Sequence, residues 1–262
     1  MARWIRFEHR AEVGFGTLEN DAVVLHRGDM FDRPEPTGER IPLSSVRVLA
    51  PVRPGKMIAL WNNFRELGAK LGVPAPAEPL YFIKASSSLL DPDGTAYRPG
   101  PYDGRIVYEA ELAIVIGRRC ASASPAEAAS CIFGYTGVND ITASDILNKD
   151  PTFPQWTRAK SFDGFGPLGP AIATGLDPAT LRIRLTLNGD ERQNYSVSDM
   201  VFPAAELVRH ISRDVTLLPG DVICCGTSVG VGTMKEPTNE VAVTIDGIGT
   251  LRTTFVNTPR PA

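Results

Sequence analysis

The sequence has no excess of one charge and no long run of like charges. Its 262 residues include 27 Lys and Arg and 30 Asp and Glu, giving a formal net charge of -3, and both signs are mixed along the chain. Proteins that bind nucleic acid or an anionic membrane surface concentrate basic residues in a patch or stripe. We therefore expect no nucleic acid and no membrane among the partners of this protein.

Long apolar segments are also missing. No stretch is long and charge-free enough to span a bilayer, and the first residues, MARWIRFEHR, lack the apolar core of a signal peptide. These two absences predict a cytoplasmic location.

Histidine and cysteine are scarce. The chain has three scattered histidines and four cysteines that form no C-x-x-C pair, namely Cys120, Cys131, Cys224 and Cys225. Typical zinc sites draw on such nitrogen and sulfur ligands. We interpret the cysteines as reduced core thiols, and any metal site as one built from oxygen ligands for a harder cation.

Glycine and proline, by contrast, are plentiful, with 24 and 22 residues. They bound many short segments of β-like pattern, which predicts a turn-rich, mainly β fold of the α+β class. The first part alternates weakly and contains the breaker-rich stretch FDRPEPTGERIP. We expect a small N-terminal β lobe over residues 1–54 and a main domain over residues 55–262.

Three segments have the patterns of helices. NNFRELGAKLG (62–72) predicts a short helix, and PAAELVRHISRD (203–214) has apolar residues at helical spacing. A third helix is predicted in SPAEAASCIFG, where Ser124 is a candidate N-cap, Pro125 suits the first helical position and Glu127 completes a capping box.

Two acidic residues interrupt an apolar strand pattern, YEAELAIVIG (108–117). Side chains alternate between the faces of a strand, so Glu109 and Glu111 point to the same face among apolar neighbours. An unpaired buried carboxylate is costly or takes up a proton. We therefore predict a positive group between the two glutamates.

Asp140 is the candidate for a third acidic ligand. It follows a predicted strand in GYTGVNDITASD, where its side chain can turn back towards neighbouring strands. Three carboxylates suit Mg²⁺ or Mn²⁺, because hard divalent ions take oxygen ligands. The alternative is that Asp140 is the N-cap of a helix beginning at Ile141, and spacing alone leaves both interpretations open.

Lys160 stands in FPQWTRAKSFDGFGPLGP (153–170), whose aromatics, prolines and glycines are typical of a rigid loop lining a pocket. A lysine there can neutralise a substrate carboxylate or transfer protons. The alternative is a lysine that reaches solvent over Trp156 and Phe162.

A glycine-rich segment, CGTSVGVGTMK (225–235), offers backbone N–H groups and the hydroxyl of Thr227 or Ser228 to an anion such as a carboxylate. A tight turn after a core strand is the alternative interpretation.

Six segments, in this order along the chain, resemble the fumarylacetoacetate hydrolase superfamily: YFIKASSSLL, YEAELAIVIG, GYTGVNDITASD, QWTRAKSFDGFGPLGP, NGDERQ and LLPGDVICCGTSVGVG. The resemblance runs from about residue 55 to residue 256. It implies a mixed β-roll, a homodimer, and a Mg²⁺ or Mn²⁺ ion held by Glu109, Glu111 and Asp140.

The same resemblance implies a class of substrate. Such families act on small 2-oxo or 2-hydroxy-dienoic acids, whose carboxylate and neighbouring oxygen chelate the metal. Lys160 and Thr227 are then expected to contact the substrate, with Lys84 and Gln155 nearby.

One segment departs from the family pattern. Hydrolytic members commonly read G-R-N-Y-x-x-H-x-x-E in a lid helix, where the His–Glu pair activates water. The matching stretch here starts at Trp61, so that Leu67 takes the histidine position and Lys70 the glutamate position. Glu66, one residue away, is the candidate replacement base if the lid shifts.

The resemblance, together with the altered lid motif, therefore implies an enzyme that decarboxylates or isomerises a small 2-oxo diacid of aromatic-compound breakdown, with Lys160 as a catalytic residue. Such chemistry needs an electron sink and an anchored carboxylate rather than an activated water. Two alternatives stay open. One is a C–C hydrolase of 2,4-dioxo acids that uses Glu66 as its base, and the other is a catalytically weak metal-binding homologue.

A homodimer is the first testable expectation. Sedimentation at micromolar concentration is expected to give about twice the 28.3 kDa mass of one chain. A mass near that of a single chain would contradict the implied dimer.

Overall fold

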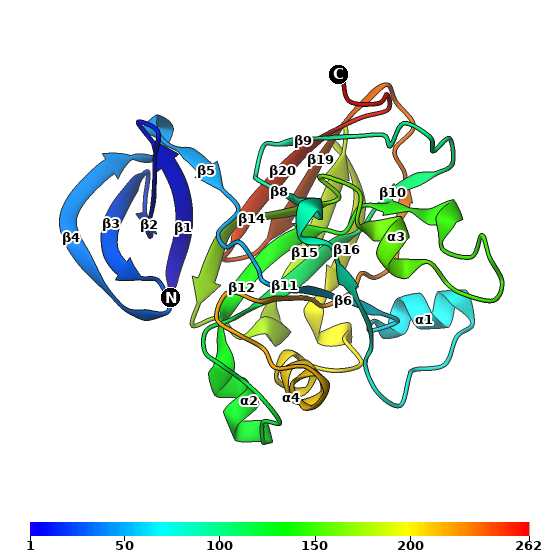
Figure 1. Ribbon diagram of the computed structural model, residues 1–262, viewed down its shortest axis with the longest axis horizontal. Helices are drawn as coiled ribbons and strands as arrows, with labels where there is room; N and C mark the ends of the chain where they lie inside the picture. Colours follow the sequence, from blue (N-terminus) through cyan, green and yellow to red (C-terminus); the bar gives the residue numbers. More distant parts are fainter. Residues whose placement is uncertain (262) are drawn as a thin grey trace.

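The N-terminal strands form an antiparallel meander, at the left of Figure 1. The computed structural model describes residues 1–261 of the chain. Within them the meander runs in the order β4-β3-β2-β1 and consists of β1 (Ala2–His9), β2 (Glu12–Glu19), β3 (Ala22–Asp29) and β4 (Asp32–Pro42). A 3-10 turn, η1 (Leu43–Ser45), then leads to β5 (Arg47–Leu49), which pairs with β1.

This meander is the edge of a much larger sheet. β1 pairs with β14 (Gly166–Thr174), and Ala2 lies opposite Thr174. Beyond β14 the sheet continues through β12 (Ile132–Asn139), β11 (Ala110–Ile116), β17 (Val222–Cys224), β6 (Met57–Trp61) and β7 (Leu80–Lys84). A short strand, β8 (Leu89–Leu90), pairs with β14 off this path. The sheet thus crosses the predicted boundary at residue 54, and the boundary itself stays a prediction.

Two smaller sheets complete the fold. The five-stranded one has the order β16 (Asp190–Ser196), β15 (Arg182–Leu187), β19 (Thr238–Ile245), β20 (Gly249–Val256) and β9 (Thr95–Tyr97). The three-stranded one consists of β13 (Thr142–Ala143), β10 (Ile106–Tyr108) and β18 (Gly232–Thr233). The five-stranded sheet packs on β11, β12 and β14. The mainly β prediction is confirmed.

The strand β11 is buried on both faces, which explains its nearly continuous apolar sequence. Leu112 and Ile114 face the main core between the two large sheets, whereas Ala113 and Val115 face a second core on the other side. This is the alternation expected of a central strand.

Four α-helices are present in the described residues: α1 (Arg65–Leu71), α2 (Pro125–Cys131), α3 (Trp156–Lys160) and α4 (Ala204–Asp214). Helices α2 and α4 lie together below the sheets in Figure 1, and α1 and α3 lie far from the N-terminal meander. Single 3-10 turns also occur, namely η2 (Ser86–Ser88), η3 (Ser144–Ile146), η4 (Pro178–Thr180) and η5 (Val197–Asp199).

The loop prediction for residues 153–170 was wrong in part. Trp156 begins α3 because its ring packs on those of Trp61 and Phe82, with ring centres 5.0 Å and 5.5 Å apart, and this fixes the helix to the sheet. Residues from Gly166 onward join β14, where β12 and β1 pair with them on both sides.

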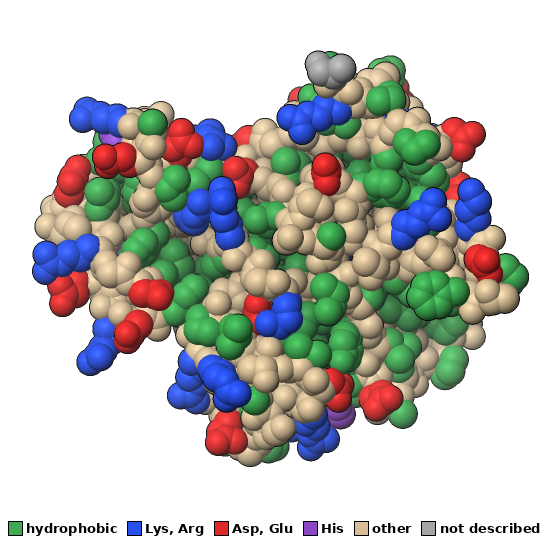
Figure 2. All heavy atoms as spheres, viewed as in Figure 1, with side chains coloured by type: hydrophobic (Ala, Val, Ile, Leu, Met, Phe, Trp, Pro, Cys, Tyr) green, Lys and Arg blue, Asp and Glu red, His purple; other side chains and the backbone are tan. Residues whose placement is uncertain are grey.

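The prediction of reduced core thiols is confirmed, since all four cysteines are free and buried. Acidic and basic side chains are interspersed on the face shown in Figure 2, as the mixed sequence implied. None of the helices described in residues 1–261 combines the length and the apolar character needed to cross a membrane.

The predicted capping box of α2 is present and gives a stability test. The hydroxyl of Ser124 accepts from the Glu127 amide, and the Glu127 carboxylate accepts from the Ser124 amide at 2.9 Å. Ser124→Ala is expected to lower the free energy of unfolding by about 1 kcal/mol, because an N-terminal amide loses its acceptor. Urea titration measures the loss. Glu127→Gln, which keeps an acceptor, is the control, and an equal loss in both variants would contradict the box.

Candidate functional site

The strand predicted over residues 108–117 is broken at Glu109, which lies between β10 and β11. Its amide donates to the side chain of Asn139 at 3.0 Å, and its carbonyl accepts from the Asp140 amide at 2.8 Å. The backbone therefore leaves one sheet for another at this residue. The break brings the side chains of Glu109 and Asp140 together.

Three carboxylates meet at this junction, namely those of Glu109, Glu111 and Asp140. One oxygen from each lies within 4.8 Å of the others. Glu111 and Asp140 are buried, with 1% and 0% exposure. No helix begins at Ile141, because residues 142–143 form β13, so the N-cap interpretation of Asp140 is wrong.

Two lysines supply positive charge to this group. Lys84, from β7, donates to Asp140 Oδ1 at 2.6 Å and also to the carbonyls of Lys160 and Phe165. Lys160, at the end of α3, donates to Glu109 Oε2 at 2.8 Å, to Asp140 Oδ2 at 2.7 Å and to the hydroxyl of Thr142 at 2.6 Å. An ammonium group has three donors, so both lysines are saturated.

A positive group between Glu109 and Glu111 stays a prediction. The cation beside Glu109 is Lys160, which pairs with Glu109 and with Asp140 but not with Glu111. Its side chain is 3% exposed, so the alternative of a lysine reaching solvent over aromatic rings is wrong.

Two opposing effects set the pKa values of these carboxylates and lysines, namely burial and the charges of their neighbours. Burial raises the pKa of Glu111 well above its ordinary value, and burial also raises the pKa of Glu109 although Lys160 opposes it. Burial acts in the same sense on Asp140, but Lys160 and Lys84 outweigh it and lower its pKa. Burial alone would lower the pKa of Lys160, but the carboxylates hold it above its ordinary range. Lys160 is therefore a persistent cation.

Glu111 is held at one oxygen only. Its Oε2 accepts from the amide of Gly226 at 2.9 Å, in the turn after β17. Its Oε1 is buried and has no hydrogen-bond partner anywhere in residues 1–261. A buried carboxylate oxygen without a partner is costly, so this atom is the one in the group with an unmet need for a cation.

The peptide groups of Ala110, between the two glutamates, are held by side chains from β16 in the five-stranded sheet and from the turn after β17. The amide of Ala110 donates to Gln193 Oε1 at 2.9 Å, and its carbonyl accepts from the hydroxyls of Thr227, at 2.9 Å, and Tyr195. Gln193 also donates to Thr227 at 2.9 Å. Thr227 thus lies beside the carboxylates, and its role as a substrate contact stays a prediction.

The remaining predicted residues lie around the group rather than in it. Gln155 is the N-cap residue of α3, with its side chain half-buried and without a cap hydrogen bond. Glu66 and Lys70 are exposed on α1, and Leu67 packs against the main core. Ser228 is buried, and its hydroxyl has no partner in the described chain.

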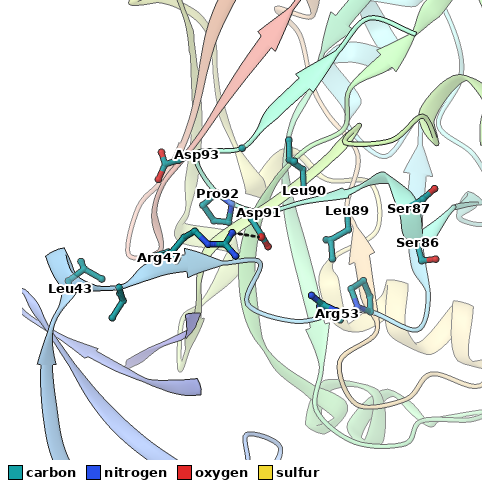
Figure 3. A pocket seen from close by; sticks show the side chains of 14 residues that line it. Leu43, Arg47, Arg53, Ser86, Ser87, Leu89, Leu90, Asp91, Pro92 and Asp93 are labelled. Carbon is teal, nitrogen blue, oxygen red and sulfur yellow. Dashed lines mark hydrogen bonds and ion pairs between the residues drawn. The ribbon is translucent and has the colours of Figure 1, made fainter. Parts of the chain in front are cut away.

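A cavity of about 1030 Å³ lies apart from the carboxylates, between residues 43–54, which follow the N-terminal meander, and residues 86–94. Figure 3 shows it bridged by the ion pair of Arg47 with Asp91, 3.2 Å long. None of the three carboxylates lines it. A search guided by cavity volume alone would therefore have missed the three carboxylates.

Comparison with known proteins decides the family. Residues 56–256 match the family model described as fumarylacetoacetate (FAA) hydrolase C-terminal. The chain belongs to the fumarylacetoacetate hydrolase family. A further family model, described as Rv2993c-like, N-terminal, matches residues 2–51. The resemblance drawn from the six sequence segments is confirmed.

Solved structures of the family share its fold. 2-Hydroxyhepta-2,4-diene-1,7-dioate isomerase from Mycobacterium marinum is 35% identical, with a TM-score of 0.89 over 99% of this chain and 100% of that chain. 5-Carboxymethyl-2-hydroxymuconate delta-isomerase from Mycobacterium smegmatis is 38% identical, with a TM-score of 0.89 over 97% of this chain and 99% of that chain. These likenesses confirm the predicted fumarylacetoacetate hydrolase-like fold.

A relative known from its sequence is oxaloacetate tautomerase FAHD2A, mitochondrial, from Bos taurus. It is 37% identical over 201 residues, which cover 75% of this chain and 63% of that protein. The similarity therefore extends over part of the bovine protein only.

Sequence reasoning missed four residues that shape the site: Thr142, Gln193, Tyr195 and Gly226. Thr142 bridges Glu109 and Lys160, and its hydroxyl donates to Glu109 Oε1 at 3.0 Å. A signal existed, because most of them fall inside segments that resemble the family: Thr142 in GYTGVNDITASD, Gln193 in NGDERQ and Gly226 in the glycine-rich turn. The contacts themselves are long-range and left no local pattern.

The pairing of Lys84 with Asp140 gives a stability test. Lys84→Met is expected to lower the free energy of unfolding by about 3 kcal/mol, because removing one partner of a buried pair leaves charge uncompensated. Lys56→Met is the control, since Lys56 pairs with Asp221 at 2.5 Å but keeps 22% of its side chain exposed. Urea unfolding without metal measures both. A loss in Lys84→Met no larger than in the control would contradict the role given to Lys84.

Proposed function

We propose that Glu109, Glu111 and Asp140 hold one divalent metal ion, Mg²⁺ or Mn²⁺. The observation that carries the proposal is the buried, partnerless Oε1 of Glu111, on a carboxyl group that has an oxygen within 4.8 Å of an oxygen of Glu109 and of Asp140. The donor set fits, because it is all oxygen, as such hard ions require. The other carboxylate oxygens already accept hydrogen bonds, but each keeps a lone pair for a cation.

The charge of the group supports an anionic substrate. Three carboxylates against two ammonium groups leave one net negative charge when all are ionised. A divalent ion would reverse this sign to one net positive charge. A buried positive centre attracts a carboxylate strongly, because the surrounding dielectric is low. The site then suits a small organic acid.

We propose that the reaction is keto–enol isomerisation of a small 2-oxo or 2-hydroxy-dienoic diacid. When bound, the ion supplies Lewis-acid polarisation of the substrate oxygens. Lys160 is the chain's own candidate for stabilising the developing enolate, because its Nζ is a cation with three N–H donors beside the carboxylates. It reaches a substrate oxygen only by releasing Glu109, Asp140 or Thr142. The tautomerase and isomerase names of the relatives support isomerisation over decarboxylation.

Hydrolysis lacks a matching group on α1. Leu67 is apolar and packs against the main core, so it neither takes nor gives a proton. Lys70 and Glu66 point into solvent. Glu66 as a replacement base therefore stays a prediction that requires α1 to move. The completeness of the carboxylate and lysine group argues against a catalytically weak homologue.

Three further expectations remain predictions. They are the homodimer, the cytoplasmic location, and substrate contacts from Lys84, Gln155 and Thr227. Lys84 already uses all of its donors within the protein, so a substrate contact there needs one of them to be released.

A substrate panel with paired lysine variants tests the function. Oxaloacetate, a 2-hydroxy-2,4-dienedioate and an acylpyruvate are each supplied with Mg²⁺ or Mn²⁺, and the enol absorbance is followed above its spontaneous rate. Lys160→Ala is expected to lower isomerisation ~10²–10³-fold, the usual cost of removing one donor to a developing oxyanion. Lys70→Ala is the exposed control and is expected to stay near wild type. Chelation with EDTA is expected to abolish activity.

Two outcomes would overturn the proposal. Efficient acylpyruvate hydrolysis that is lost in Glu66→Gln would replace isomerisation with hydrolysis. Unchanged Mn²⁺ affinity in Glu111→Gln, measured by calorimetry, would refute the metal ligands.

A further inference from the structure

Asn63, just before α1, is a buried polar residue that the proposed chemistry does not use. It is 1% exposed. Its Nδ2 donates to the carbonyl of Cys225 at 2.9 Å, and its Oδ1 accepts from the amide of Phe202 at 2.9 Å. The side chain thus fastens two segments distant in sequence to the start of α1.

The Cys225 carbonyl belongs to the same peptide group as the Gly226 amide. That amide donates to Glu111 Oε2 at 2.9 Å. Asn63 therefore reaches Glu111 through two hydrogen bonds that share one peptide unit. Hydrogen bonds in such a chain polarise one another, so donation to the carbonyl strengthens the amide as a donor.

The turn that carries this peptide is closely packed. Gly226 has φ of +89°, and a Cβ there would lie 3.4 Å from both the Leu60 carbonyl oxygen and the Cβ of Asn63. Only glycine adopts this conformation without strain. The backbone at Gly226 therefore lies directly against Leu60 and Asn63.

The entry to α1 is also fixed on its other side. The guanidinium of Arg65 donates to the carbonyls of Asp199, Met200 and Val201, and the Val201 amide donates to the Asn63 carbonyl at 2.8 Å. Asn63 thus joins the docked helix on one side to the turn that holds Glu111 on the other.

We propose that Asn63 is a positioning residue that orients Glu111 through the Cys225–Gly226 peptide and so couples the docking of α1 to the affinity of the metal site. We call the two hydrogen bonds from Asn63 to Glu111 through this peptide the relay. The inference rests on the proposed function for its metal, but not for the relay itself. By linkage, whatever loosens the start of α1 weakens metal binding, and metal binding tightens the start of α1.

The neighbouring residue offers a matched control. Asn62 Nδ2 also donates to a backbone carbonyl at 2.8 Å, but that carbonyl is of Pro74, which follows α1 in the chain and does not belong to the turn that holds Glu111. Asn62→Asp and Asn63→Asp thus make the same chemical change at adjacent positions, each removing one amide donor. Asn63→Ala is a second variant, without a side-chain donor at any pH.

Metal affinity is measured by calorimetric titration with Mn²⁺. Asn63→Asp and Asn63→Ala are expected to weaken binding about tenfold or more, the usual effect of a residue that orients a metal ligand. Asn62→Asp is expected to keep the wild-type affinity. Thermal unfolding without metal shows whether each variant is folded. Equal affinity in the Asn63 and Asn62 variants would overturn the coupling.

A second readout needs no metal. With ¹⁵N-labelled glycine, the chemical shift of the Gly226 amide is expected to change in both Asn63 variants, because the Cys225–Gly226 peptide loses a hydrogen bond there. It is expected to be unchanged in Asn62→Asp, where that hydrogen bond remains. An unmoved Gly226 resonance would overturn the relay. Absence of Mn²⁺ binding in the wild type would instead refute the proposed metal site, while the resonance still decides the relay.

Discussion

The attraction between the Asp140 carboxylate and two ammonium groups is the interaction on which the main domain depends. Lys84 comes from β7 at the sheet edge and Lys160 from the end of α3, and the carboxylate follows β12. Neither charge is tolerable in the core alone, because the desolvation of an unpaired ion costs several kcal/mol. The pairs therefore fix α3 and β7 against the centre of the sheet. They also leave Glu111 as the acid without a cationic partner, which makes the site asymmetric.

Local patterns predicted much of the fold and the chemistry. The spacing of glycine and proline predicted a mainly β fold. The segment S-P-A-E predicted where α2 begins. The acidic pair within an apolar strand pattern predicted the group of carboxylates. These features follow from what a few consecutive residues need, namely turn geometry, amide acceptors and compensation of charge. The helix over residues 203–214 could be predicted for the same reason, since its buried residues recur at helical spacing.

Long-range contacts could not be predicted from the chain in this way. The break at Glu109 depends on the Asn139 side chain, which replaces a strand partner, and the helix α3 depends on aromatic packing with Trp61 and Phe82. Asn63 looked like part of an altered lid motif, yet its side chain serves a turn 162 positions further along the sequence. Such partners become visible only once the sheets have brought them together.

The pairing of β1 with β14 also covers what would otherwise be an open edge of the large sheet. Without residues 1–54, β14 would present unpaired amide and carbonyl groups from Ile172 to Thr174, where β1 now covers them. An open edge of this kind is a template for another strand, and natural sheets blunt or cover such edges to avoid association. The N-terminal meander is in this sense a cover for the rest of the large sheet. It ends the sheet at β4, an exposed strand that contains three prolines and several charges.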